Sequence, residues 1–240
     1  MWRVVPLLDP VIMRSAMSIE IIDFGESEYK IILDLQRDLF TRLVEAKRRK
    51  KKEKEFILIG SHYPVVTMGR RAQEANLLLS RDRLSEMGIE VHNIERGGDV
   101  TYHYPGQAVL YPIIDLESHG LGVKDYVGIL EESVITLLSE HGIIGERIEG
   151  ATGVWIGKGS REERKISAIG VKCSRFCTMH GLSLNVDDDL EGFKLINPCG
   201  YKDKGVTSIE RETGHKIELG IIKKRLAEIF QDLIAKHPAK

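Results

Sequence analysis

Cysteine and aromatic residues are scarce in this chain of 240 residues, which has three cysteines and an aromatic fraction of 6%. Three cysteines are too few for a disulfide framework, and an odd number in a chain of this length is typical of a reducing compartment. Long hydrophobic runs are missing too, because no uncharged apolar stretch approaches the roughly 18 residues of a membrane-spanning helix. We therefore expect a soluble, cytoplasmic protein with no membrane partner.

An excess of charge of either sign is also missing. Thirty-five Lys and Arg residues stand against 36 Asp and Glu residues, for a net charge of −1. This balance argues against a dedicated nucleic-acid-binding protein, although it leaves room for local basic patches. The hydrophobic fraction of 42% and the charged fraction of 30% exclude disordered and collagen-like chains.

The N-terminal stretch has no signal-peptide pattern. Asp9 and Pro10 interrupt its short apolar run, and no small-residue cleavage site follows. A recognisable strand pattern begins only at Ile19. We expect residues 1–16 to be an N-terminal extension, with Met17 as an alternative start, and residues 17–240 to form a single domain.

Hydrophobic periodicity predicts an alternation of strands and a few helices. Helices are expected at residues 29–46, 81–87, 123–140 and 218–234, and strands at residues 19–24, 56–60, 65–68, 91–94, 100–103, 108–116, 153–156, 165–173 and 182–186. Pro112 lies inside one of these strands, which favours a sheet edge or a bulge there, since proline cannot donate to a ladder. The pattern predicts an α+β fold with a mixed, largely antiparallel sheet flanked by helices.

Cys199 lies between Pro198 and Gly200, in a segment that begins at Asn197. Proline fixes its own φ and glycine permits conformations closed to other residues, so this turn is suited to presenting a thiol in a cleft. Two interpretations stay open from the residues alone: a nucleophile, or a small buried hydrophobic residue.

The stretch RGGDVTYHYPGQ, from Arg96 to Gln107, combines glycines with polar side chains. Gly97 and Gly98 permit close approach of the backbone to a ligand, which is typical of a pocket wall. The stretch is neither a P-loop nor a dinucleotide-binding motif. A glycine-rich bulge and turn is the structural alternative.

Two later strands carry further candidates. Lys165 opens one of them, where a lysine is ordinarily a solvated residue, and His180 lies next to a glycine in the other. Cys173 and Cys177 have a C-x3-C spacing, but no second pair at zinc-finger spacing completes a site, so we predict no metal.

Four segments together resemble the lipoyl(octanoyl) transferase family of lipoate biosynthesis. They are PVVTMGR at residues 64–70, RGGDVTYHYPGQ at residues 96–107, residues 165–185, and NPCG at residues 197–200. Tyr104 stands where the family commonly has a glycine, a change expected to narrow the acyl pocket. The basic run at residues 47–52 and the N-terminal extension are not family features.

The resemblance implies a biotin/lipoyl ligase-like fold and a thioester mechanism without a cofactor. Cys199 would be the acyl-accepting nucleophile and Lys165 its partner, with His103 and His180 as secondary candidates for positioning. The implied acyl-substrate pocket comprises Arg96, Gly97, Gly98, Asp99, Val100, Thr101, Tyr102, His103, Ala168, Ile169, Gly170, Gly181, Leu182 and Ser183.

The implied reaction moves an octanoyl group from acyl carrier protein to a lysine of a lipoyl domain. The acceptors would be the E2 subunits of 2-oxoacid dehydrogenases and the H protein of glycine cleavage. Acyl carrier proteins are typically acidic, so the basic residues 47–52 or 161–165 are candidates for steering the donor. The alternative for residues 47–52 is a solvated helix end without a partner.

Three alternatives remain open. An ATP-dependent lipoate or biotin ligase shares the fold but needs no cysteine nucleophile. A noncatalytic partner-binding or RNA-binding module would use the basic run. A cysteine hydrolase would release free acid from an acyl thioester without an acceptor lysine.

Overall fold

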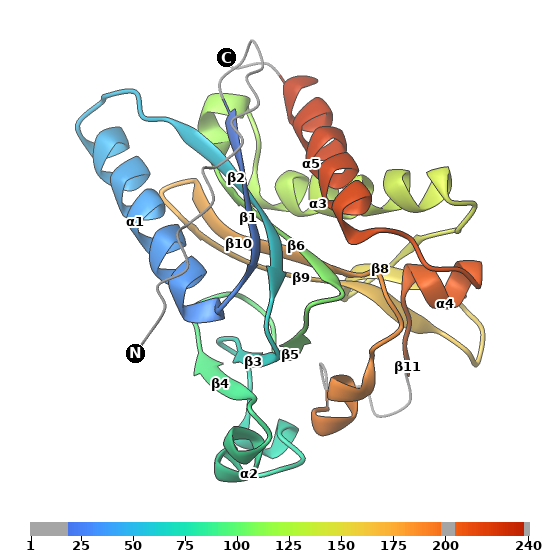
Figure 1. Ribbon diagram of the computed structural model, residues 1–240. Coiled ribbons are helices and arrows are strands. Elements are labelled where there is room, and N and C mark those ends of the chain that lie inside the picture. Colours follow the sequence, from blue (N-terminus) through green and yellow to red (C-terminus); the bar gives the residue numbers. More distant parts are fainter. Residues whose placement is uncertain (1–18, 198–204, 238–240) are drawn as a thin grey trace.

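The computed structural model describes residues 19–197 and 205–237 (Figure 1). An eight-stranded sheet forms the centre of the molecule, and helices cover both of its faces. Within the described ranges, no helix is long and apolar enough to cross a membrane.

The main sheet has the strand order β1-β2-β6-β10-β9-β8-β7, and β11 pairs with β9 off this path. The pairs β1–β2 and β9–β11 are parallel, whereas the other pairs are antiparallel. This arrangement confirms the predicted α+β fold with a mixed, largely antiparallel sheet. The strands are β1 (Ile19–Ser27), β2 (Glu55–His62), β6 (Gln107–Ile113), β7 (Glu146–Ile148), β8 (Ala151–Ile156), β9 (Arg164–Ser174), β10 (Cys177–Asn185) and β11 (Gly205–Val206).

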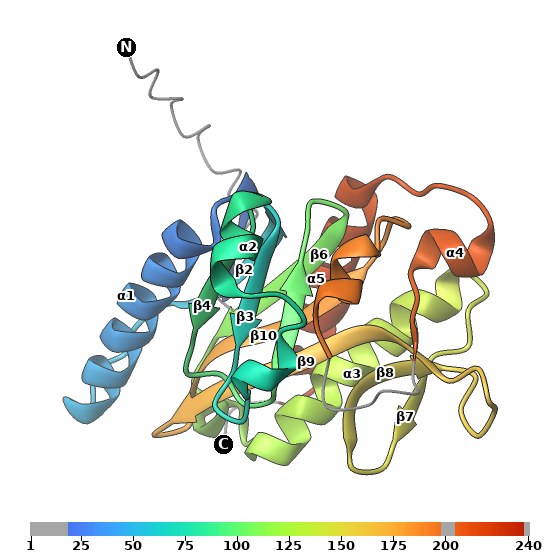
Figure 2. The ribbon, with the colours of Figure 1, turned by 90° about the horizontal axis from the view of Figure 1, so that it is seen from below.

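A second, three-stranded sheet has the order β4-β3-β5. Its strands are β3 (Val65–Met68), β4 (Glu90–Asn93) and β5 (Val100–His103), and the short helix α2 (Arg81–Glu86) connects β3 with β4. Figure 2 shows this small sheet and α2 in front of the central strands of the main sheet. Each strand was predicted, but their separation into a sheet of their own was not.

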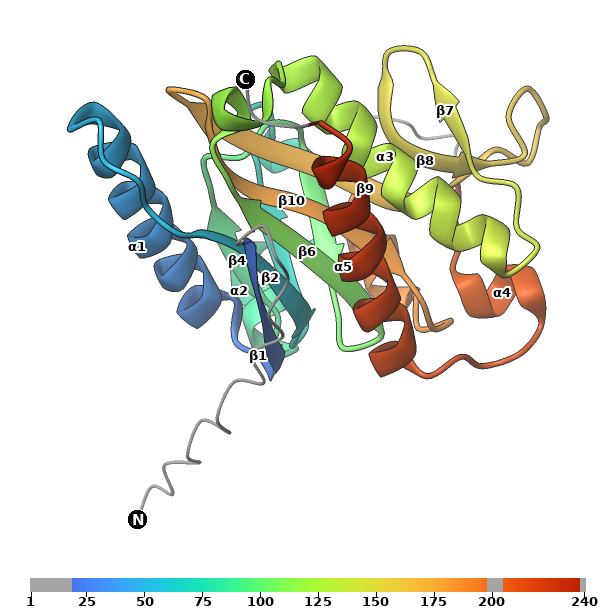
Figure 3. The same ribbon diagram turned by 90° about the horizontal axis from the view of Figure 1, so that it is seen from above.

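Helices α3 (Val123–Glu140) and α5 (Leu219–Ala235) lie across one face of the main sheet (Figure 3). Because apolar side chains recur every three or four residues, each helix turns one continuous stripe toward the strands. In α3 this stripe includes Tyr126, Leu130, Val134 and Leu137, which are all fully buried. The stripe packs on apolar side chains of the strands and of α5 to form the largest core.

Helix α1 (Tyr29–Arg48) covers part of the opposite face, where the small sheet also packs. Its buried residues include Ile32, Leu33, Leu39 and Leu43, which follow the same helical spacing. The short helix α4 (Ile209–Thr213) follows β11, and neither element was predicted from the sequence.

Pro112 lies in the centre of the main sheet, so of the two predicted alternatives, an edge or a bulge, the sheet edge is wrong. On the β2 side the ladder is continuous, with Pro112 opposite Ile57. On the β10 side, pairing stops after Leu110 and resumes as a bridge between Asp115 and Cys177. The hydroxyl of Thr178 donates to the carbonyl of Pro112 at 2.9 Å, which satisfies an acceptor that the interrupted ladder leaves over.

Candidate active site

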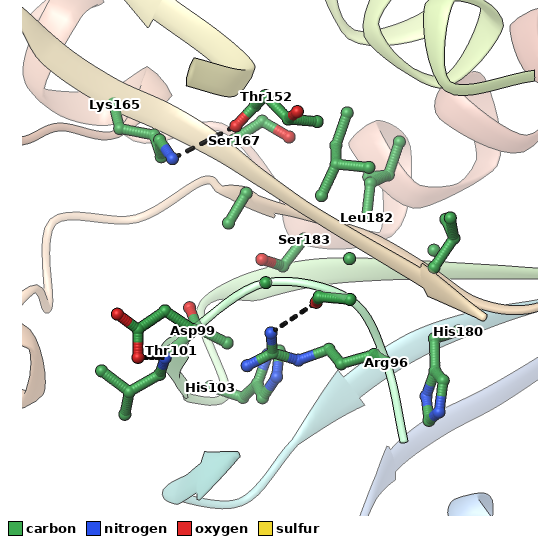
Figure 4. A pocket seen from close by; sticks show the side chains of 18 of the residues that line it. Arg96, Asp99, Thr101, His103, Thr152, Lys165, Ser167, His180, Leu182 and Ser183 are labelled. Atoms are coloured by element: carbon green, nitrogen blue, oxygen red, sulfur yellow. Dashed lines mark hydrogen bonds between the residues drawn. The ribbon is translucent and has the colours of Figure 1, made fainter. Parts of the chain in front are cut away.

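A cavity of about 480 Å³ lies between strands β9 and β10 of the main sheet and the loop at residues 96–99. Figure 4 shows the loop from Arg96 facing these strands across the cavity. Most of its walls come from the loop, from β5, β9 and β10, and from the short stretch at residues 150–155.

The loop lies close to β9 because glycines allow backbones to approach each other. The amide of Gly97 donates to the carbonyl of Val171 at 2.9 Å. A Cβ on Gly170 would stand 2.7 Å from the carbonyl oxygen of Gly97, closer than real Cβ contacts allow. Gly98 adopts a left-handed φ of 91°, which an L side chain rarely tolerates. The glycine pattern read from the sequence thus builds a cavity wall.

Most of the predicted pocket residues line this cavity. They are Arg96, Gly97, Gly98, Asp99, Val100, Thr101, His103, Ala168, Ile169, Gly170, Gly181, Leu182 and Ser183. Tyr102 is the exception, because side chains alternate along a strand and its neighbours Thr101 and His103 face the cavity. Tyr102 instead stacks on Tyr104, with ring centroids 6.0 Å apart.

Tyr104 does not narrow the cavity, so that expectation is wrong. Its ring belongs to the core of the small sheet and contacts Phe193, and its hydroxyl donates to the carbonyl of Asp187 at 3.0 Å. The tyrosine therefore supports the loop from behind.

Lys165 lies at one end of the cavity, near the start of β9 (Figure 4). Its Nζ donates to the carbonyl of Thr152 at 3.2 Å and lies 4.5 Å from the centroid of the Trp155 ring. Trp155 is itself fixed, because its Nε1 donates to the carbonyl of Ala151 at 2.8 Å. The half-buried amino group of Lys165 is thus held over an aromatic ring at the cavity wall.

A chain of buried side-chain hydrogen bonds joins the small sheet to the Lys165 strand. His103 contacts Thr67 Oγ1 through Nε2 at 3.3 Å and Gln107 Oε1 through Nδ1 at 2.7 Å. The amide of Gln107 donates to Asn185 Oδ1 at 2.9 Å. Asn185 in turn donates to the carbonyl of Thr207 at 2.9 Å, and the Thr207 amide donates to the carbonyl of Lys165 at 3.0 Å.

The network fixes the protonation state of His103. Because the Gln107 amide nitrogen donates to Asn185, its oxygen accepts, so Nδ1 of His103 carries the proton. Burial lowers the pKa of His103 to about 3. His103 is therefore a neutral imidazole with both nitrogens engaged within the protein, which suits a positioning role.

Arg96 anchors the loop to the small sheet. Its guanidinium donates to the carbonyl of Thr67 at 2.7 Å and to the hydroxyl of the same residue at 3.0 Å. Arg96 is 8% exposed, so these bonds form in a largely water-free setting where they hold the loop firmly.

Cys199 lies outside the described residues, so its pairing with Lys165 stays a prediction. The described residues that flank its segment are well anchored. On one side, Asn197 donates its amide to the carbonyl of Asn76 at 2.8 Å, and the Asn76 side chain donates to the Asp99 carboxylate at 2.8 Å. On the other side, β11 pairs in parallel with β9, with Val206 opposite Lys165.

Sequence reasoning missed Asn76, Thr67, Asn185 and Trp155 as parts of the site. Thr67 and Asn185 lie inside the motif segments, and this position in the sequence could have identified them as site residues. Asn76 and Trp155 carried no local signal, because their partners are distant in sequence or are backbone groups.

The two neighbouring cysteines do not converge on a metal. Cys173 packs against the core beneath α3 and α5, whereas Cys177 belongs to the core beneath α1. Burial raises the pKa of Cys177 to about 11, which disfavours the thiolate that a metal ligand requires. Among the residues that the structure describes, no group of three or more His, Cys, Asp or Glu side chains is placed to hold a metal ion.

Comparison with known families places this fold and cavity in a defined class. Residues 29–231 match the family described as the lipoyl protein ligase A/B catalytic domain, and the chain belongs to this family. The resemblance predicted from the four motif segments is thereby confirmed.

Within this family, the chain is similar to proteins named octanoyltransferase. A relative from Parabacteroides distasonis is 46% identical over 214 residues, which cover 89% of this chain and 97% of the relative. A relative from Porphyromonas gingivalis is 47% identical over 87% of this chain but 43% of its own length.

The fold is also similar to that of a bipartite lipoate protein ligase from Thermoplasma acidophilum, solved in a study that included its E2 lipoyl domain. The TM-score is 0.67 at 15% sequence identity, over 91% of this chain and 84% of the other. At this identity the likeness shows the fold, which agrees with the predicted ligase-like architecture.

Proposed function

We propose that this protein is an octanoyltransferase of protein lipoylation. It takes an octanoyl group from the thioester of acyl carrier protein and delivers it to a lysine of a lipoyl domain. The observation that carries the proposal is one cavity lined by residues from the motif segments, with Lys165 at one end, in a chain 46% identical to an octanoyltransferase over most of its length.

In the first half-reaction, the Cys199 thiolate attacks the carbonyl carbon of the donor thioester. The bond to the pantetheine sulfur breaks, and the carrier leaves as a thiol after taking up a proton. A free cysteine has a pKa of about 8.5, so only a small fraction is ionised near neutrality. Lys165 assists, either by stabilising the thiolate as an ammonium or by accepting the thiol proton as an amine.

In the second half-reaction, the lysine amine of the lipoyl domain attacks the thioester on Cys199. An amide forms, the Cys199 sulfur leaves, and Lys165 accepts the proton that the incoming amine loses. Thioester exchange is near thermoneutral and conversion of a thioester to an amide runs downhill. The reaction therefore needs no ATP.

The cavity suits the acyl chain between these steps. Ala168, Ile169 and Leu182 supply apolar surface in its middle, and each buried methylene contributes about 0.8 kcal/mol to binding. Gly170 and Gly181 pair across β9 and β10, and a Cβ would stand 2.7 Å from the carbonyl oxygen of Gly97 at the first and 2.1 Å from that of Leu110 at the second, so neighbouring backbone closes both positions to larger side chains.

We assign the whole activity to residues 17–240 as a single catalytic domain and treat residues 1–16 as an extension. We place the enzyme in the cytoplasm, with octanoyl-acyl carrier protein as donor. The acceptors are lipoyl domains of 2-oxoacid dehydrogenase E2 subunits and the H protein of glycine cleavage.

Intact-mass analysis tests the proposal directly. The full chain is mixed with octanoyl-acyl carrier protein in the absence of ATP, and the adduct is mapped by peptide analysis. We expect one octanoyl group on Cys199, which disappears when a lipoyl domain is added and reappears on the lysine of that domain. Cys173→Ala serves as the matched control and keeps the adduct, whereas Cys199→Ala loses it.

Three results would overturn the proposal. An equal adduct in Cys199→Ala would place the acyl group elsewhere, and a strict need for ATP would point to a ligase. Release of free octanoate at the same rate with and without the lipoyl domain would point to a hydrolase.

A further inference from the structure

The cavity has an open end and a closed end. Lys165 lies at the open end, where the lining residues Gly150, Thr152 and Gly205 are exposed to solvent. The carbonyl of Thr152 accepts the hydrogen bond from Lys165 Nζ, and Gly205 pairs with the residue before Lys165. His180 lies at the other end, where it is 2% exposed and has a left-handed φ of 59° (Figure 4). A donor therefore enters at the Lys165 end.

An octanoyl chain fills only part of the distance between these two ends. His180 pairs with Val171 of β9, which is six residues beyond Lys165, and six residues of a strand span about 20 Å. Carbon–carbon bonds are about 1.5 Å long, so the zigzag of an eight-carbon chain spans about 9 Å. The acyl chain thus fits inside the cavity without reaching His180. The pantetheine arm that carries it has to lie at the open end.

Arg71 lies on the rim of this open end. It lines the cavity and its side chain is exposed. Its amide donates to the carbonyl of Gly98 at 3.1 Å, which fixes the arginine to the loop. The next residue, Ala72, packs in the same apolar cluster as Val206, and Val206 pairs with Lys165 across β11 and β9. Both connections place Arg71 toward the end of the cavity at which the donor enters.

The guanidinium of Arg71 is available to a ligand. It forms no ion pair and donates no side-chain hydrogen bond to any other residue that the structure describes. Asp99, an acidic residue of the lining, is already engaged, because its carboxylate accepts from the Asn76 side chain at 2.8 Å and from the Val100 amide at 2.7 Å. Arg96, the other arginine of the lining, is buried and anchors the loop. Arg71 is therefore the arginine of the lining that can bind an anion.

We propose that Arg71 binds the phosphate group of the donor's phosphopantetheine arm. The inference deepens the proposed function and rests on it, because acyl carrier proteins hold the acyl group on such an arm. About 13 bonds separate the thioester sulfur from the phosphorus, so the extended arm spans roughly 16 Å, enough to run from a thioester beside Lys165 to the rim. A guanidinium presents parallel N–H donors that match the oxygens of a phosphate, and the opposite charges strengthen these hydrogen bonds.

Two small donors test this subsite: octanoyl-pantetheine and octanoyl-4′-phosphopantetheine, which differ by the phosphate alone. Each is given to the full chain with a lipoyl domain as acceptor, and kcat/KM for amide formation is measured by mass. We expect wild type to favour the phosphorylated donor by about fivefold or more, the scale of an exposed charged pair. In Arg71→Gln this preference disappears. In Arg71→Lys, which keeps the charge but not the planar fork, part of the preference remains.

Arg70→Gln is the matched control. Arg70 precedes Arg71 in the same turn and is exposed too, but it does not line the cavity. The two arginines fix the turn through their backbone amides, which donate to the carbonyls of Arg96 and Gly98, so neither side-chain replacement removes these bonds. We expect Arg70→Gln to keep the wild-type ratio between the two donors. Each readout is a ratio within one enzyme, so a change in overall rate does not affect it.

Octanoyl-acyl carrier protein separates the phosphate from the acidic surface of the carrier. If Arg71→Gln slows transfer from the carrier while wild type shows no preference between the small donors, Arg71 contacts acidic side chains and the phosphate subsite is overturned. It is also overturned by an unchanged ratio in Arg71→Gln, by an equal fall in Arg70→Gln, or by a wild type that uses the carrier but neither small donor. Failure of wild type to transfer octanoyl even from the carrier would instead overturn the proposed function.

Discussion

The two faces of the main sheet are packed in different ways. Beneath α3 and α5, aliphatic and aromatic side chains form the largest continuous core of the described residues. Beneath α1 and the small sheet, buried His62, His103, Gln107 and Asn185 form hydrogen bonds, and the cavity lies among polar and glycine residues. The first face stabilises the fold by burying apolar side chains. The second face is packed less completely, because it holds the cavity and the hydrogen bonds that align its polar groups.

The largest expected effect is on the cavity face, at Lys165. Lys165→Met removes the amino group next to the Trp155 ring, and we expect the transfer rate to fall by about 10²- to 10⁴-fold, the usual contribution of a positioned acid or base. Lys194→Met, at an exposed lysine paired with Glu191, is the control and keeps the wild-type rate. A Lys165→Met enzyme within tenfold of wild type would contradict the assignment.

On the apolar face, beneath α3 and α5, substitutions are expected to change the stability of the fold. Phe230 of α5 is fully buried and packs against Tyr126 of α3. Phe230→Ala leaves a cavity, and we expect the free energy of unfolding to fall by about 3–5 kcal/mol in urea titrations. Ile221→Ala, at a residue 58% exposed on the same helix, is the control and changes it little. A similar loss in both variants would contradict the burial of Phe230 as its source, since alanine is the better helix former at both positions.

Acid separates the two faces further, because the buried neutral histidines lie on the cavity face. Burial lowers the pKa of His62 to about 4, and that of His103 and His180 to about 3, from an ordinary value of 6.5. Between pH 6.5 and 4 the unfolded chain therefore binds protons that the folded chain does not. The free energy of unfolding therefore keeps its full value above pH 6.5 and decreases as the pH falls below it.

The slope of this loss is limited to about 1.4 kcal/mol per pH unit for each histidine. Urea unfolding at pH 7, 6 and 5 measures it, and His103→Gln serves as the comparison, with a shallower slope. A stability that stays constant from pH 7 to pH 5 would contradict the burial of these imidazoles.

Gln107→Met tests the hydrogen-bond network itself. It removes the acceptor of His103 Nδ1 and the donor to Asn185, and leaves both groups buried without these partners. We expect a loss of about 1–3 kcal/mol in the free energy of unfolding, together with a lower transfer rate because the Lys165 strand is no longer tied to His103. Gln73→Met, at an exposed position, is the control. If Gln107→Met lowers the stability but leaves the transfer rate unchanged, the network supports the fold and does not contribute to transfer.

The smallest effect is expected from the basic run at residues 47–52. Lys47 is already paired with Asp115 and Glu117, and the end of α1 lies about 28 Å along the helix from Tyr29, which lines the cavity. We expect Lys50→Ser, Lys51→Ser and Lys52→Ser together to leave the transfer rate unchanged at low and high salt. A rate that falls at low salt would assign donor docking to this run.

Much of the fold was readable from the sequence because its elements are locally encoded. The predicted helix at residues 123–140 coincides with α3, since its apolar stripe has a clear period, and Gly88 follows α2 with a left-handed φ of 76°. The small sheet was not readable as a separate unit. Its strands pair Val65 with His103 and with Glu90, and such long-range partners leave no mark in a local pattern.

The site was readable to the extent that its residues lie in compact motifs. Glycines at 97 and 98 indicated a pocket wall because close backbone approach requires them. Tyr102 was assigned to the pocket with its neighbours, but strand alternation turns it into the core of the small sheet. The orientation of His180 depends on a single backbone angle, which the side-chain sequence does not encode.

Pro112 has a consequence for how the central strands find one another. Its missing N–H faces a position where Thr178 and Gln36 provide the compensating hydrogen bonds, and a shifted alignment of β6 with β10 would separate the proline from that set. A slip of one residue would also turn every apolar side chain of β6 to the wrong side. The proline therefore favours the native alignment of β6 with β10 over a shifted one while the sheet forms.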